Sequence, residues 1–197
     1  MKSLYGYLIE PIGERYNNTK DVDGKELILN SEIYNHQYTN RRAKVLSVPL
    51  LGGDGEIKPG DEVIVHHNIF RRWHDVKGVE RNSKSFFEDN KYIVNLDQIY
   101  LYKRKGEWKP IKGFCFVQPI KRNNVFGIDN EHSTRGIVKY TDGSVDKGDL
   151  VGFTPFSKYE FIIDGEKLYR VYSKFITIKY EYQGDEEVYN PSWAQGS

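Results

Sequence analysis

The sequence predicts an all-β protein built from two small β-barrels in tandem with long loops, on three observations. Runs of β-branched and aromatic residues, bounded by turn residues, follow one another at the spacing typical of barrels and sandwiches. No segment shows a sustained helical period. Blocks of the first half recur in the same order in the second half, which indicates an internal repeat.

Eight segments combine these strand-forming residues. They are Tyr7–Ile12, Ala43–Val48, Glu62–His66, Lys91–Tyr102, Phe114–Ile120, Gly136–Tyr140, Asp149–Phe153 and Leu168–Tyr180. Asp89-Asn90 and Asp164-Gly165 each lie between strand-like runs, as a two-residue hairpin turn requires. Each repeat also contains a turn ending in Gly-Asp, at Gly60-Asp61 and at Gly148-Asp149. There glycine permits a positive φ and aspartate can accept hydrogen bonds from nearby amides.

Three pairs of matching blocks define the repeat. Residues 7–12 match 116–120, residues 57–65 match 145–153, and the hairpin around Asp89-Asn90 matches the one around Asp164-Gly165. We therefore expect one domain over residues 1–105 and a second over residues 106–183. Charged residues 103–107 are expected to form the linker, and residues 184–197 a flexible C-terminal tail.

Composition limits the function classes. The 197 residues carry 29 Lys and Arg against 28 Asp and Glu, so a general attraction to nucleic acid or to an anionic membrane is not expected. Cys115 is the single cysteine, which favours a reducing compartment. The N-terminal residues do not resemble a signal peptide, and no apolar run is long enough for a membrane helix. A cytoplasmic protein is expected, in the host cytoplasm if the source is viral.

The order of these blocks resembles the chaperonin-10 (GroES-like) family. That family's pattern is an N-terminal strand with a proline, a long loop with a hydrophobic tripeptide, a strand, a Lys-x-Gly-Asp turn with its strand, a hairpin and a C-terminal strand. In the first repeat Pro11, the loop 14–40 and the turn Lys58–Asp61 match it. In the second, Ser133–Gly136 is similar to the family's junction between loop and strand.

The resemblance implies a ring-forming lid that binds a chaperonin to assist protein folding. The matching docking segment runs from Gly24 to Leu29 and departs from the family pattern by inserting Lys25 and Glu26. The resemblance implies that Gly24, Leu27, Ile28 and Leu29 contact the chaperonin. The alternative is that Leu27, Ile28 and Leu29 form another buried strand. In the second repeat Val125, Phe126 and Ile128 form either a second docking element or a shortened loop that packs locally.

Motifs of enzymes and of cofactor sites are not found. The sequence contains neither Gly-x-x-x-x-Gly-Lys-Ser/Thr nor Gly-x-Gly-x-x-Gly, the two glycine-rich motifs that bind phosphate groups. No catalytic residues or cofactors are expected. His66 and His67 are expected on opposite faces of a strand, which disfavours a shared metal ion. Cys115 is expected to be a small core residue.

Two hypotheses of different class therefore remain. The first is a co-chaperonin-like protein that self-associates into a ring and binds a chaperonin (GroEL-like) apical domain. The second is a structural or assembly protein, for example a virion component, that reuses the fold. The basic and aromatic segment 70–87 is an insertion relative to the compact family barrel. It is expected to be a solvated loop or subunit contact, with nucleic-acid stacking as the alternative.

Overall fold

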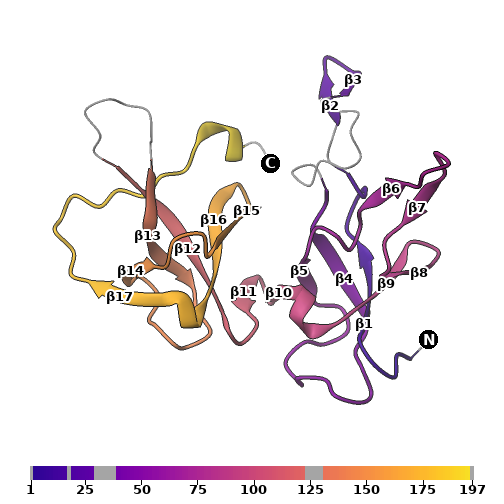
Figure 1. The fold of residues 1–197 in the computed structure, drawn as a ribbon, viewed down its shortest axis with the longest axis horizontal. Helices are drawn as coiled ribbons and strands as arrows, with labels where there is room; N and C mark the ends of the chain where they lie inside the picture. The colour runs from indigo at the N-terminus through magenta and orange to yellow at the C-terminus, as the bar shows by residue number, and fades with distance from the viewer. Residues whose placement is uncertain (1, 17–18, 29–38, 123–130, 196–197) are drawn as a thin grey trace. The chain divides into compact units, whose positions relative to one another are not determined.

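The computed structural model describes residues 2–16, 19–28, 39–122 and 131–195. The chain divides into two compact units, Met1–Glu107 and Trp108–Ser197. The secondary structure consists of strands and three short 3-10 helices, so the all-β prediction is confirmed (Figure 1). None of the described helices is long and apolar enough to cross a membrane.

The first unit is organised around a seven-stranded sheet with the order β11-β10-β5-β4-β1-β9-β8. Its strands are β1 (Tyr7–Pro11), β4 (Arg42–Ser47), β5 (Glu62–Val65), β8 (Phe86–Glu88), β9 (Lys91–Val94), β10 (Ile99–Arg104) and β11 (Glu107–Pro110). β11 begins at the last residue of the first unit, and its remaining residues belong to the second unit. Two hairpins lie outside this sheet, β2 (Thr19–Val22) with β3 (Lys25–Ile28) and β6 (Arg72–His74) with β7 (Glu80–Asn82). The 3-10 helix η1 (Leu96–Gln98) precedes β10.

The second unit has a six-stranded sheet with the order β15-β16-β12-β13-β14-β17. Its strands are β12 (Phe114–Lys121), β13 (Glu131–Tyr140), β14 (Leu150–Phe153), β15 (Lys158–Ile163), β16 (Glu166–Tyr172) and β17 (Ile176–Tyr180). The 3-10 helices η2 (Ser173–Phe175) and η3 (Ser192–Ala194) complete the unit. In both large sheets the hydrogen-bonded order runs from one edge strand to another without closing.

The two units repeat one strand order. Reading the first sheet from its β8 edge gives β8-β9-β1-β4-β5-β10, which corresponds strand for strand to β15-β16-β12-β13-β14-β17. The register agrees as well: Pro11 pairs with Ala43 as Pro119 pairs with Gly136, and both pairs of strands carry a bulge two to three residues earlier. The repeat read from the sequence is therefore a repeat of topology and register.

The Gly-Asp turns are built alike in the two units. The Asp61 carboxylate accepts a hydrogen bond from the Lys58 amide at 2.8 Å, and Asp149 accepts one from the Asp146 amide at 3.1 Å. Gly60 and Gly148 both have φ 91°. Each aspartate also pairs with a cation on the strand that lies beside the one following it in the chain, Asp61 with Arg104 on β10 and Asp149 with Lys179 on β17.

The two hairpin turns expected from the sequence are confirmed. Asp89 and Asn90 both have positive φ between β8 and β9, and Asp164 and Gly165 have positive φ between β15 and β16. This is the geometry of type I′ turns, which match the twist of the paired strands. The expected linker differs from the structure: Lys105 and Gly106 form the turn of a hairpin between β10 and β11.

Residues 184–195 of the expected tail lie along the second unit. The Tyr189 amide donates to Pro119 O at 2.8 Å, and the Lys121 amide donates to Glu187 O at 2.7 Å. Asn190 bonds the turn of the β15–β16 hairpin, and Ala194 is fully buried. Backbone hydrogen bonds to β12 and the side chain of Asn190 hold this segment, and its polar composition does not predict these contacts.

Candidate functional site

The long connection between β1 and β4 leaves and re-enters the first unit at one fixed stem. Tyr16 and Thr39 form an isolated antiparallel bridge, and both are buried. The Asn40 amide donates to Arg15 O at 2.9 Å, and the Asn40 side chain donates to the carbonyls of Ile12 and Glu14. Residues 17–38 therefore begin and end at adjacent, anchored positions.

Arg15 and Tyr16 fasten this stem to residues 66–85, the segment that connects β5 to β8. Arg15 donates from Nε and Nη2 to Phe70 O at 3.1 and 2.9 Å and from Nη1 to Asn82 at 2.9 Å. The Arg72 amide donates to the Tyr16 hydroxyl at 2.6 Å. Burial lowers the pKa of the Arg15 guanidinium, so these hydrogen bonds compensate for a cation withdrawn from water.

The predicted docking residues lie on and after the β2–β3 hairpin. Asp23 and Gly24 form its tip with φ 54° and 75°, again a type I′ pattern. Leu27 lies in β3 and pairs with Lys20, and its side chain is 54% exposed. The alternative of a buried strand is wrong for Leu27, which is in a strand but not buried. Val22, across the tip, is 46% exposed.

The other predicted docking residues are less fully described. The Ile28 backbone lies in β3 opposite Thr19. Leu29 lies outside the described residues, as do Val125, Phe126 and Ile128 of the second repeat. The roles predicted for these residues stay predictions.

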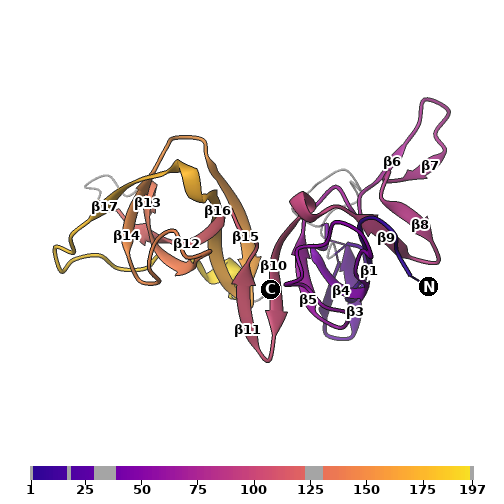
Figure 2. The ribbon, with the colours of Figure 1, turned by 90° about the horizontal axis from the view of Figure 1, so that it is seen from below.

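The β6–β7 hairpin, here called the arm, is braced at its turn. The Asp75 carboxylate accepts from the amides of Lys77 and Val79 and from Arg81 Nε, at 2.9–3.0 Å. The hydrogen bond from the Val79 amide is the largest of the effects that lower the pKa of Asp75. A second ion pair joins Arg72 and Glu80 at 3.1 Å. Figure 2 shows the arm extending beyond the sheet of the first unit, and its tip exposes Val76 fully.

Three of the residues weighed for metal or thiol chemistry can now be placed. Cys115 is fully buried, which confirms its place in the core. The prediction for His66 and His67 is wrong: β5 ends at Val65, so strand alternation does not apply, and their rings stack with centroids 4.2 Å apart. Within the described residues, no group of three or more His, Cys, Asp and Glu side chains could hold a metal ion.

An ionic cluster of the second unit was not foreseen from the sequence. Glu131 on β13 pairs with Lys158 at 3.2 Å and with Lys167 at 3.0 Å, and it accepts a hydrogen bond from the Tyr169 hydroxyl. Lys167, itself buried, also pairs with Glu160 at 3.1 Å. The cluster joins three strands and has the composition of a structural ion-pair network.

Neither a scan against protein-family models nor a search of curated proteins returns a match to this chain.

Proposed function

We propose that this chain is a co-chaperonin-like protein. Its two GroES-like barrel units assemble with other copies into a ring-forming lid, and the β2–β3 hairpin of each chain binds the apical domain of a chaperonin. The proposal is supported by the repeated strand order and register of the two units. The observation that carries it is the pair of exposed apolar side chains, Val22 and Leu27, on the hairpin that follows the stem at Tyr16 and Thr39.

The physical chemistry of such a hairpin suits reversible docking. Burying an exposed leucine against a partner contributes about 1.5–3 kcal/mol, and the conformational entropy that the contacting residues lose on binding offsets part of that gain. A single hairpin then binds weakly. Several hairpins held in one ring bind together with much higher avidity and still release one by one.

Replacing Leu27 with Ser is expected to weaken chaperonin binding by about tenfold or more per hairpin, because the buried apolar contact is lost. Val76→Ser on the arm is the matched control, since it removes an even more exposed apolar side chain from the same unit. Surface plasmon resonance on immobilised chaperonin with nucleotide measures both variants. Equal affinity of Leu27→Ser and the unchanged chain would refute the docking role of the hairpin.

A second candidate function, a structural or assembly protein, is favoured by the braced arm. In the second unit the corresponding strands β14 and β15 are joined by residues 154–157 alone, whereas the first unit carries the arm at this place. A rigid projection with an exposed valine at its tip suits a fixed contact between copies. Under this reading Val76→Ser would change the oligomeric state and Leu27→Ser would leave it unchanged.

A further inference from the structure

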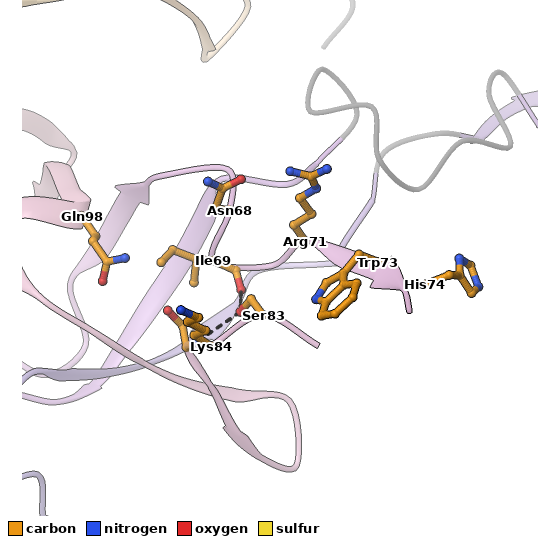
Figure 3. Close-up of a pocket in the computed structure, with 9 residues that line it drawn as sticks. Asn68, Ile69, Arg71, Trp73, His74, Ser83, Lys84 and Gln98 are labelled. Carbon is orange, nitrogen blue, oxygen red and sulfur yellow. Dashed lines mark hydrogen bonds between the residues drawn. The ribbon is translucent and has the colours of Figure 1, made fainter. Parts of the chain in front are cut away.

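A pocket lies in the first unit at the base of the arm, apart from the β2–β3 hairpin. Its volume is about 580 Å³, within the range of roughly 300–1,000 Å³ that is usual for small-molecule sites. Figure 3 shows the side chains around it. The lining residues come from β6, from the segments just before and just after the arm, and from η1, and they include Asn68, Arg71, Trp73, Lys84, Ser85 and Gln98.

The charge of this lining is one-sided. Arg71 and Lys84 line the pocket, and no Asp or Glu is among the described residues that do so. The Nε atom of Arg71 is buried and has no hydrogen-bond partner in the described part of the chain. The Nε atom of Arg72 likewise has no hydrogen-bond partner among the described residues, but the Arg72 guanidinium pairs through Nη1 with Glu80, and the Arg81 guanidinium pairs with Asp75. A buried guanidinium N–H without an acceptor indicates that an anionic ligand would complete the site.

The remaining lining indicates what the anion is attached to. Trp73 is 44% exposed and offers a ring face on which a planar group can stack. Ser85 and the Asn68 and Gln98 amides add hydrogen-bonding groups of both kinds. We propose that this pocket binds a nucleoside phosphate, with the base against Trp73 and the phosphate at Arg71 and Lys84.

A single nucleotide fits these observations better than a nucleic-acid strand. Strand-binding proteins present a continuous basic groove that follows the backbone over several nucleotides. Here the neighbouring arginines of the arm are neutralised by Glu80 and Asp75, and the chain as a whole carries a formal net charge of +1. Arg72 and Arg81 therefore have carboxylate partners, whereas Arg71 and Lys84 face a pocket whose described lining carries no carboxylate.

Isothermal titration calorimetry of the full chain with the four ribonucleoside monophosphates tests the proposal. We expect saturable binding of at least one of them at one site per chain. Adenosine without phosphate and inorganic phosphate alone should each bind at least tenfold more weakly. Arg71→Gln should weaken nucleotide binding at least tenfold, and Lys84→Gln, at an exposed position that folding tolerates, should weaken it in the same direction. Lys77→Gln, which removes a charge from the turn of the arm outside the pocket, should leave it unchanged.

Four outcomes would overturn the proposal. They are no saturable binding of any monophosphate, unchanged binding by both Arg71→Gln and Lys84→Gln, equal binding of inorganic phosphate, and binding of a tetranucleotide tenfold tighter than any mononucleotide. The third would indicate a simple anion site, and the fourth a strand-binding arm. The test does not involve a chaperonin, so its failure would leave the proposed function of the hairpin in place.

Discussion

Replacing Glu131 with Gln is expected to lower the free energy of unfolding of the second unit by about 3 kcal/mol. The substitution removes the carboxylate that Lys158 and Lys167 share; because Lys167 keeps its pair with Glu160, the cost lies at the lower end of the range for a buried charge that loses its partner. The side chain of Lys167 is only 9% exposed, so water does not replace the lost partner. Hydrogen exchange of peptides from the second unit, followed by mass spectrometry in increasing urea, measures this stability separately from that of the first unit.

The matched control is Glu187→Gln, which removes the carboxylate of an exposed ion pair with Lys121. Such pairs contribute at most about 1 kcal/mol. Burial alone would raise the pKa of Glu131, but hydrogen bonds from Tyr169 and Lys167 outweigh it and hold the pKa below its ordinary value. The carboxylate's stabilisation is therefore present above the ordinary carboxyl pKa and lost as the pH falls through the lowered value. The difference in unfolding free energy between the unchanged chain and Glu131→Gln should therefore shrink over that acidic range. Equal unfolding free energies of the two chains at neutral pH would contradict the account.

Replacing Gly136 with Val is expected to destabilise the second unit by about 3 kcal/mol, the upper end of the usual cost of overpacking. A Cβ atom at this position would lie 2.5 Å from the carbonyl oxygen of Gln118 and 3.3 Å from the Cβ of Val117. Since the first of these atoms belongs to the backbone of the paired strand β12, the clash is not relieved by turning a side chain. The same hydrogen-exchange measurement gives the change in stability.

The first unit supplies the comparison for this position. Ala43 pairs with Pro11 as Gly136 pairs with Pro119, so the equivalent site already holds a Cβ atom and is fully buried. The converse substitution Ala43→Gly should cost only about 1.5 kcal/mol, from backbone entropy and one lost buried methyl group. A Gly136→Val chain as stable as the unchanged one would show that β12 and β13 are further apart than the structure has them.

The parts of this fold that the sequence predicts are those that depend on neighbouring residues. The turns at Asp89-Asn90 and Asp164-Gly165 need positive φ, which Asp, Asn and Gly adopt most readily. The two Gly-Asp turns repeat because each aspartate bonds an amide three residues earlier. Such short-range chemistry can be read directly from the order of residues.

The parts that escaped prediction depend on contacts far apart in the chain. The stem requires Arg15 to reach Phe70 and Asn82, and the ionic cluster requires Glu131 to meet Lys167. The arm was not predicted for another reason. Its short strands β6 and β7 are largely polar and exposed, so they lack the alternation of apolar and polar residues that identifies a strand in a sequence. Gly24 and Leu27, which the sequence analysis selected by resemblance to a family pattern, lie on the β2–β3 hairpin, which that analysis did not predict.

The measurement that tests the central claim most directly is size-exclusion chromatography with light scattering, on the chain alone and then with a chaperonin and nucleotide. The account predicts a defined oligomer that co-elutes with the chaperonin only when nucleotide is present. A monomer, or an oligomer that elutes apart from the chaperonin under every nucleotide condition, would contradict the co-chaperonin function and favour the structural role.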